Sequence, residues 1–208
     1  MKNNLLIWDL ETSGLDFASS KVLEIGALIV DKSGNKTEKR WLLDNKIDIP
    51  KEASDINGIT NEVIEKEGKD PKKCLLEFLP HFKDCDVNIT HNGIKFDIPF
   101  LIIYTSKVLN FTEEEKQELY SLVRGTAYDT AVPIKSEKIG LKIDKDESFI
   151  AFAERVMSVR AYGVLYNLAI CCDELGIDRS KVVQHRALSD VYLTHLVYES
   201  LQGRQIKN

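Results

Sequence analysis

Three strand-like segments near the N-terminus constrain the fold of this 208-residue chain more than any other feature. NNLLIWDLE, VLEIGALIVD and TEKRWLLD are apolar runs of strand length, and a Ser-Gly-Asn turn separates the second from the third. They predict a β-meander. Two shorter segments, DVNIT and TAYDTAVPI, predict single strands among helices further along the chain. This order predicts an α/β fold with a central mixed five-stranded β-sheet flanked by α-helices.

Helical segments account for most of the remaining sequence. Their apolar residues recur at three- and four-residue spacing, as Phe149, Phe152 and Val156 do. Thr112 and Glu115 have the spacing of an N-terminal capping box. The predicted helices lie in NEVIEKEG, PKKCLLEFLPHF, the second half of HNGIKFDIPFLIIYTSKVL, TEEEKQELYSLV, ESFIAFAERVMSVRA, VLYNLAICCDELGI and ALSDVYLTHLVYESL. We expect loops over residues 45–60 and over Lys135–Asp146.

The composition is that of an ordinary soluble globular protein, with 43% hydrophobic and 29% charged residues. The net charge of −5 argues against a broad basic surface for long nucleic acid, but allows local binding where metal ions neutralise acids. The four cysteines form no C-x-x-C pair, so we interpret them as reduced, buried thiols. The chain shows neither a signal peptide nor about 20 consecutive apolar residues, so we expect no membrane contact and a cytoplasmic location.

Two carboxylates stand at the end of the first predicted strand. Because side chains alternate along a strand, Ile7, Asp9 and Glu11 share one face. Carboxylates so close together repel each other unless a cation lies between them. Taken alone, an Asp-x-Glu pair after an apolar run is more typical of a strand that ends at its solvated edge. The pair indicates a functional site only if other parts of the chain add to it.

Three further residues provide that addition. Asp97 begins a predicted helix just after a short strand, His185 precedes the last helix, and Asp190 follows about one and a half turns later. Each alone has an ordinary structural interpretation. Together, the four negative charges of these carboxylates would be balanced by two divalent cations. Oxygen ligands without cysteine select Mg²⁺ or Mn²⁺. Two such ions about 3.5–4 Å apart, with a histidine as general base, are typical of phosphodiester hydrolysis.

The motifs that carry these residues resemble those of the DnaQ-like 3′–5′ exonucleases of the DEDDh type, in the RNase H-like superfamily. The first motif is WDLETSGLD, followed by Glu24 in EIGAL; the second is HNGIKFDIPFL and the third is HRALSD. The resemblance covers residues 4 to about 110, 125 to 132 and 162 to 201. Arg186 stands where the related DEDDy type has a tyrosine, so the histidine type is indicated.

The resemblance implies an RNase H-like fold and a hydrolase that releases nucleoside 5′-monophosphates from a 3′ end with two Mg²⁺ or Mn²⁺ ions. Asp9 would bridge both ions. Glu11 and Asp190 would complete one metal site, and Asp97 would support the other, partly through water. His185 would be the general base that activates the attacking water.

The resemblance also implies that Thr12, Ser13, Gly14, Leu15 and Ile59 bind the substrate. Asn92 and Phe96 are further candidates for substrate binding. Ile59 would pack on the terminal base, although Asn57 replaces the histidine of the family's HGIT segment. Phe96 would stack on a base unless it packs in the core.

The sequence departs from the family in two places, and both affect the expected domain organisation. The stretch at about 133–161 is longer than usual, so we expect an insertion there within a single exonuclease domain over residues 1–208. It would be a lid, a partner surface or an inert addition. The chain stops soon after the third motif without an evident polymerase-binding tail, which favours a free-standing proofreading or repair-type nuclease. A homodimer is an open option.

The expected substrate is a DNA 3′ end, single-stranded or frayed. The nearest alternative is the same chemistry on RNA, as in enzymes that trim RNA ends or degrade short oligoribonucleotides, because discrimination depends on the 2′-hydroxyl. DLETS resembles the D-x-D-x-T signature of aspartyl-phosphate enzymes, but Glu11 and Ser13 occupy the places of its second aspartate and its threonine. A non-catalytic nucleic-acid-binding module with a decayed site is a remote alternative, since all five catalytic residues are present.

Overall fold

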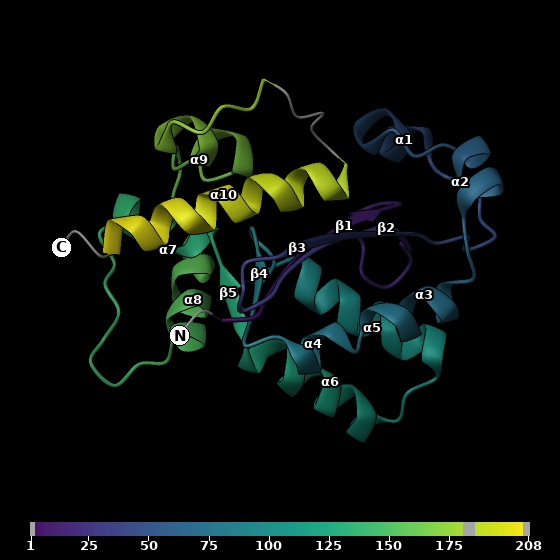
Figure 1. Ribbon diagram of the computed structural model, residues 1–208, viewed down its shortest axis with the longest axis horizontal. Helices are drawn as coiled ribbons and strands as arrows, with labels where there is room; N and C mark the ends of the chain where they lie inside the picture. Colours follow the sequence, from purple (N-terminus) through teal and green to yellow (C-terminus); the bar gives the residue numbers. More distant parts are fainter. Residues whose placement is uncertain (1–2, 181–185, 206–208) are drawn as a thin grey trace.

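A mixed five-stranded sheet forms the centre of the protein (Figure 1). The computed structural model describes residues 3–180 and 186–205. The strands are β1 Leu5–Thr12, β2 Val22–Val30, β3 Lys36–Leu42, β4 Val87–Thr90 and β5 Ala127–Asp129, in the order β3-β2-β1-β4-β5. β1, β2 and β3 are antiparallel neighbours, whereas β4 runs parallel to β1 and β5 parallel to β4. The predicted α/β fold and its mixed sheet are confirmed.

Helices surround the sheet, and several start where the sequence predicted. The helices of the described residues are α1 Lys51–Asn57, α2 Asn61–Glu67, α3 Pro71–Phe78, α4 His81–Asp84, α5 Asp97–Leu109, α6 Glu113–Gly125, α7 Ala131–Ile139, α8 Phe149–Ser158, α9 Leu168–Leu175 and α10 Ala187–Gln205. The capping box of α6 forms, with the Thr112 hydroxyl accepting from Glu115 N and the Glu115 carboxylate accepting from Thr112 N. None of the described helices is long and apolar enough to cross a membrane.

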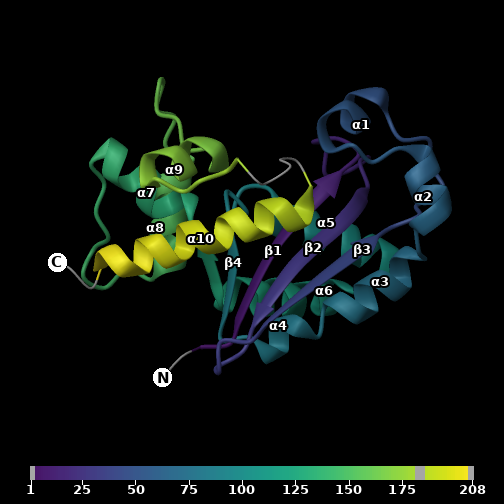
Figure 2. The same ribbon diagram turned by 45° about the horizontal axis from the view of Figure 1, so that its top comes forward.

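The sheet separates α10 on one face from α3, α5 and α6 on the other (Figure 2). Leu6 and Trp8 pack in the main core, which α3, α5 and α6 complete on one face of the sheet. Ile7 packs on the other face against Val191 of α10. Because residues two apart share a face, Asp9 also points toward α10.

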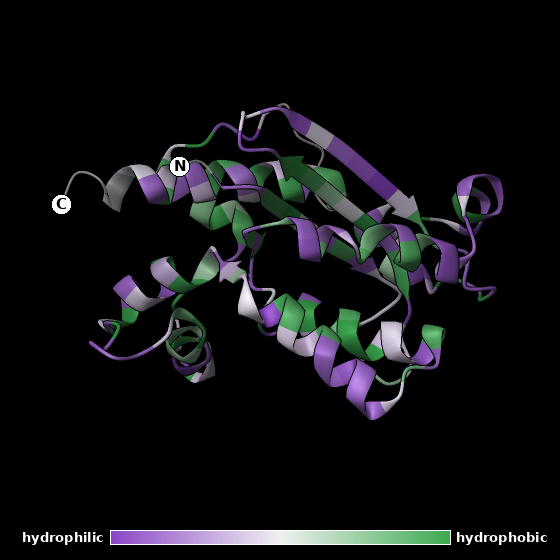
Figure 3. Ribbon diagram, turned by 60° about the horizontal axis from the view of Figure 1, so that its bottom comes forward, coloured by the Kyte–Doolittle hydropathy of each residue, from purple (hydrophilic) through white to green (hydrophobic). Residues whose placement is uncertain are grey.

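Figure 3 shows how hydropathy follows this arrangement: the inner strands are hydrophobic, and the edge strand β3 is mostly hydrophilic. The first four residues of β3, Lys36 to Lys39, are exposed. A charged edge strand opposes pairing with another chain.

Helices α7, α8 and α9 form a third group beside β4 and β5 (Figure 1). Phe152 and Val156 of α8 pack against Ala131 of α7. Cys171 and Cys172 of α9 are buried with α10 side chains. All four cysteines are free thiols. Cys74, Cys171 and Cys172 are buried as predicted, whereas Cys85 is half-buried.

Two predicted loops are partly wrong. Residues 45–60 contain α1, a single short helix that ends at Gly58, whose φ of 66° is a left-handed conformation. The segment from Lys135 begins inside α7, and the predicted strand TAYDTAVPI ends at Asp129. Lys135 is only 1% exposed, because its ammonium donates to two carbonyl oxygens at the end of α8. Lys135 is therefore polar because its ammonium binds the carbonyl oxygens at the end of α8, and not because it lies in a solvated loop.

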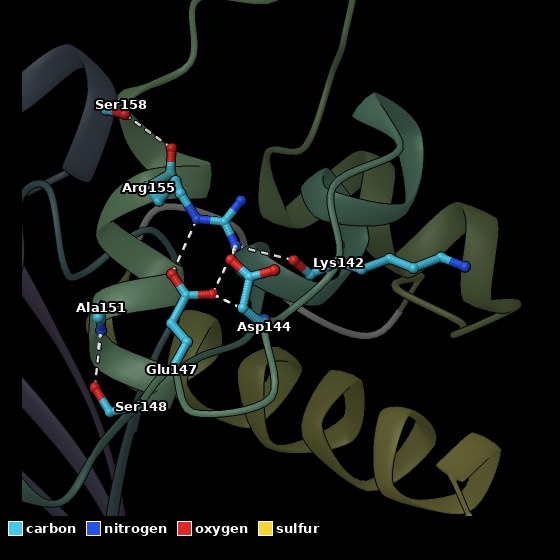
Figure 4. A network of polar contacts seen from close by, with 7 residues as sticks. All are labelled: Lys142, Asp144, Glu147, Ser148, Ala151, Arg155 and Ser158. Carbon is cyan, nitrogen blue, oxygen red and sulfur yellow. Dashed lines mark hydrogen bonds and ion pairs between the residues drawn. The ribbon is translucent and has the colours of Figure 1, made fainter.

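The loop between α7 and α8 is tied to α8 by Arg155 (Figure 4). The Arg155 guanidinium donates to the Glu147 carboxylate from Nε at 2.9 Å and to the Lys142 carbonyl oxygen from Nη2 at 2.9 Å. The connection therefore has a defined path, which leads the chain from α7 into α8.

Candidate active site

The carboxylates of three predicted residues meet between the sheet and α10. Asp9 and Glu11 lie on the α10 face of β1, and Asp190 lies in the first turn of α10. One carboxylate oxygen from each of the three lies within 4.8 Å of the others. The structure therefore brings together residues that are about 180 positions apart in sequence.

Gly26 of β2 allows α10 to come this close. It is the antiparallel partner of Asp9, so the two residues share a face of the sheet. A Cβ atom at Gly26 would lie 2.6 Å from the Ala187 carbonyl carbon and 2.8 Å from Leu188 N. The start of α10 therefore rests directly on the backbone of β2, with Asp190 one helical turn further along.

Asp97 joins the cluster from α5, the helix that follows β4. It is buried at the first position of the helix, and its Oδ1 accepts a hydrogen bond from Leu10 N at 3.2 Å. A carboxylate is favourable at this end of a helix because the helix dipole is positive there. The bond to β1 places Asp97 beside Asp9, whose pKa it raises.

Burial and mutual repulsion raise the pKa values of these acids. Burial, followed by the charge of Asp97, raises the pKa of Asp9 well above its usual range. Burial, followed by the charge of Asp190, raises the pKa of Glu11 to about 8. Burial raises the pKa of Asp97 to about 7. Carboxylates in this state take up protons or cations, and a divalent metal can replace the protons.

The donor set fits divalent metal ions with a preference for oxygen ligands. Asp9, Glu11 and Asp190 supply three convergent carboxylates without a sulfur or nitrogen ligand. This is the ligand chemistry of Mg²⁺ and Mn²⁺. The acidic cluster predicted as a metal site is thus present, and Asp97 is the adjacent fourth acid.

A buried ion-pair network lies beside the cluster. Glu24 is the cross-strand partner of Glu11 and is 0% exposed. Its Oε2 lies 3.0 Å from Arg40 Nε and 3.5 Å from Arg186 Nη2. The network links β2, β3 and the residue that precedes α10, so it supports the position of that helix start.

Asp129 shapes the opposite wall of the site. Its buried carboxylate accepts from the backbone N–H groups of Asn92 and Ile94, at 2.8 and 3.1 Å. These bonds fix the loop between β4 and α5, in which Asn92 has a φ of 64°. His91 extends the wall, because its Nε2 donates to the Tyr166 carbonyl oxygen at 2.8 Å.

A pocket of about 400 Å³ opens at the cluster. Its lining comes from β1, the β4–α5 loop, the residues just before α9, and α10. The lining residues are Asp9, His91, Asn92, Val164, Leu165, Tyr166, Asn167, Leu168 and Asp190. Asn92 Oδ1 is buried without a hydrogen-bond partner in the protein, so this predicted substrate residue offers an acceptor to a ligand.

The other predicted substrate-binding residues occupy different surroundings. Thr12 and Ser13 hold the turn after β1, since the Thr12 hydroxyl donates to the Gly14 carbonyl oxygen and Ser13 Oγ accepts from Lys21 N. Leu15 follows them and is 81% exposed, which makes it available to a ligand.

Two of the predicted substrate residues pack against the protein itself. Ile59 is 0% exposed in a small core with Leu23 and Leu42, so in this structure it has no surface to offer a base. Phe96 packs against Phe17 and Phe100, with ring centroids 5.9 and 5.5 Å away, which is the core-packing alternative. His185 lies outside the described residues.

Several residues of the site were not identified from the sequence. Gly26, Arg40 and Asp129 carry no signal of their own, because their roles depend on strand register and on contacts between distant segments. Asn57 was noted only as a departure. Its side chain accepts from Ile59 N and donates to the Thr12 carbonyl oxygen, so it links α1 to the turn after β1.

A mixed five-stranded sheet carries convergent acids from β1 and α10 at one end, with Asp97 of α5 beside them, which is the arrangement that the DnaQ-like, RNase H-like resemblance implies. The family model RNase_T, described as Exonuclease, matches residues 6–198. The chain belongs to this exonuclease family. The resemblance derived from the motifs is confirmed at the level of this family.

Curated relatives are large DNA polymerases. The PolC-type DNA polymerase III of Thermotoga maritima is 26% identical over 193 residues, which make up 93% of this chain and 11% of that protein. The PolC-type DNA polymerase III of Mycoplasma genitalium is 34% identical over 96 residues, 46% of this chain and 6% of that protein. The chain thus corresponds to a small part of the length of these relatives.

Solved structures with the same fold include exonuclease I. The structure of E. coli exonuclease I in complex with a dA16 oligonucleotide has a TM-score of 0.69 and 18% identity, and the match covers 99% of this chain and 42% of that chain. Exonuclease I from Methylocaldum szegediense has a TM-score of 0.67 and 18% identity, covering 98% and 41% of the two chains. These matches show a common fold.

Proposed function

We propose that this protein is a metal-dependent 3′–5′ exonuclease of the DEDDh type that releases nucleoside 5′-monophosphates from single-stranded or frayed DNA 3′ ends. The observation that carries the proposal is the convergence of Asp9, Glu11 and Asp190 beside buried Asp97. Membership of the exonuclease family supports a nuclease. DNA as substrate is supported by the DNA polymerase relatives and by the oligonucleotide bound in the exonuclease I structure.

In this proposal residues 1–208 form a single exonuclease domain that holds two Mg²⁺ or Mn²⁺ ions. Asp9 would be shared between them, with Glu11 and Asp190 completing one site and Asp97 supporting the other. When bound, the ions would supply charge stabilisation on the scissile phosphate and an activated water at neutral pH.

The chain's own residues would position the substrate and move the proton. The turn from Thr12 to Leu15 would receive the terminal nucleotide, with exposed Leu15 against the base and Asn92 Oδ1 as an acceptor at the pocket wall. His185, one residue before Arg186, is proposed as the general base that takes the proton from the attacking water.

A nuclease panel on the purified chain, without a polymerase, tests the proposal. The substrates are single-stranded DNA, duplex DNA, a mismatched 3′ end and RNA, each with Mg²⁺, with Mn²⁺ and with EDTA. We expect mononucleotide release from labelled DNA 3′ ends only with metal. Asp9→Asn should lower the rate by about a thousandfold or more, because the shared ligand supports several kcal/mol of transition-state stabilisation.

Asp48→Asn is the matched control, since Asp48 is an exposed carboxylate in the loop before α1. It should leave the rate unchanged. A metal-dependent rate that survives Asp9→Asn would contradict the two-metal proposal. Faster hydrolysis of RNA than of DNA would replace the proposed substrate by RNA while leaving the chemistry in place.

A further inference from the structure

The connection between α8 and α9, residues 159–167, is anchored by three cationic or donor side chains. Lys135 Nζ donates to the Val159 carbonyl oxygen at 2.9 Å, and Lys138 Nζ donates to the Leu165 carbonyl oxygen. His91 Nε2 donates to the carbonyl oxygen of Tyr166, whose ring also lies under the Lys135 ammonium. Both ends of the connection are therefore fixed to α7 and to the wall of the active site.

Between these anchors the connection turns its side chains outward. Tyr162 is 97% exposed, the largest exposed fraction among the described large hydrophobic residues. Gly163 has a φ of 77°, a left-handed conformation that favours glycine and makes the turn after Tyr162. Arg160 is also exposed. The anchored turn thus presents an aromatic ring with an apolar face and a polar hydroxyl to solvent, two residues after an exposed arginine.

The same connection borders the active site. Val164, Leu165 and Tyr166 line the pocket that contains Asp9 and Asp190. Tyr162 and Arg160 come just before these lining residues in the chain. The turn that carries Tyr162 is therefore adjacent in the chain to the wall of the pocket.

We propose that Arg160 and Tyr162 form a platform for the single-stranded nucleotides on the 5′ side of the scissile bond. This inference rests on the proposed exonuclease function and specifies its substrate as an unpaired strand. An aromatic ring stacks on any base, so it binds without sequence preference, and an exposed arginine two residues away in the chain adds positive charge for the phosphate backbone. Local contacts of this kind suit a chain with a net charge of −5, which lacks a charge excess for binding long nucleic acid. Paired bases do not present a free face to stack on.

The test compares two substrates that differ in the nucleotides on the 5′ side. One is a single-stranded DNA of about twelve nucleotides, and the other is the p-nitrophenyl ester of thymidine 5′-monophosphate, which has none. Tyr162→Ala should raise KM for the oligonucleotide by about 5- to 150-fold with little change in kcat, which corresponds to the loss of one stacked base. Hydrolysis of the ester should stay unchanged, and Tyr162→Phe should behave like the unsubstituted protein on both substrates.

Tyr120→Ala is the matched control, because Tyr120 is an exposed tyrosine of α6, on the other layer of the fold. It should leave both KM values unchanged. A direct readout uses oligonucleotides with 2-aminopurine at the second, third or fourth position from the 3′ end, bound in the presence of EDTA. Stacking should quench the fluorescence at one of these positions, and Tyr162→Ala should abolish that quenching.

The inference is overturned if Tyr162→Ala leaves the oligonucleotide KM within twofold of the unsubstituted value, or if it weakens ester hydrolysis equally. These outcomes differ from failure of the proposed function, in which the unsubstituted protein would hydrolyse neither substrate with Mg²⁺ or Mn²⁺.

Discussion

Gly26→Ala is the substitution that most directly tests how the fold positions the acidic cluster. The new Cβ would lie 2.6 Å from the Ala187 carbonyl carbon, 2.7 Å from Ala187 Cβ and 2.8 Å from Leu188 N. The first two contacts are with carbon atoms, for which about 3.5–4.0 Å is a favourable separation. Because the neighbours include helix backbone, a side-chain rotation alone does not relieve them. The start of α10 must move away from β2 by roughly 1 Å.

This displacement has a cost in stability and a larger one in activity. Overpacking of a close contact lowers the free energy of unfolding by about 1–3 kcal/mol. Asp190 lies one turn beyond Ala187, so it moves with the helix start and away from Asp9 and Glu11. A misplacement of about 1 Å in a catalytic group costs on the order of 100-fold in rate. We therefore expect Gly26→Ala to fold with a lower urea midpoint and to lose about 99% of kcat at saturating Mn²⁺.

The assay needs a control that adds the same methyl group elsewhere. Gly125 at the end of α6 has no heavy atom within 4 Å of the position of an added Cβ. Gly125→Ala should keep full activity and gain up to about 1 kcal/mol, because alanine restricts the unfolded chain. Urea unfolding, Mn²⁺ binding by calorimetry and single-turnover hydrolysis would be measured on both variants. The double variant Gly26→Ala with Ala187→Gly removes one of the three contacts and should recover part of the loss.

Two results would refute this reasoning. One is a Gly26→Ala protein whose urea midpoint and kcat equal those of Gly125→Ala. The other is a Gly26→Ala protein that loses stability but binds Mn²⁺ and turns over at the unsubstituted rate, because the helix start would then not set the position of Asp190.

Two further predictions concern protonation and the anchored connection. In EDTA the melting temperature should fall as the pH rises from 5 to 8. Burial raises the pKa of Glu11 to about 8 and that of Asp97 to about 7, so both groups hold a proton more tightly in the folded protein than in the unfolded chain. The stability that this gives is fully present below the unfolded-state pKa and is lost as the two groups ionise in the folded protein. Mn²⁺ should therefore raise the melting temperature more at pH 8 than at pH 6, and an increment independent of pH in scanning fluorimetry would contradict this. Lys135→Met should lower the free energy of unfolding by about 1–3 kcal/mol, since it leaves the Val159 carbonyl oxygen without its charged donor, and an unchanged urea midpoint would count against this anchor.

The strands and most helices could be predicted from the sequence because local pattern and tertiary packing agree in them. The run from Leu5 to Leu10 alternates between two buried faces, and the Thr112 capping box satisfies the first N–H groups of α6. The predicted secondary structure was wrong where tertiary packing overrides the local sequence pattern. Lys135 reads as a polar loop residue, yet its ammonium is buried because carbonyl oxygens at the end of α8 accept from it.

The acids of the site could be predicted because each belongs to a motif with recognisable spacing. The residues that hold them in place could not. The contact of Gly26 with Ala187 follows from the register of β2 against β1 and from the path of α10, and neither is encoded in a local pattern. For Ile59 the motif was the misleading signal. The motif implied contact with a ligand, but in the structure Ile59 is buried in a small core with residues of α1 and β3.

The arrangement of positive charge beside the cluster affects the charge of Glu11. Arg186 lies close enough to Glu11 to lower its pKa, and an arginine that paired fully with Glu11 would occupy the place of a cation. Glu24 competes with Glu11 for Arg186, because its buried carboxylate lies within ion-pair distance of both Arg186 and Arg40. A buried carboxylate with two guanidinium partners is itself stabilised, whereas removal of one partner would leave an uncompensated charge. Glu24 therefore acts on the neighbouring arginines, and it holds both guanidinium groups at the sheet, beside Glu11.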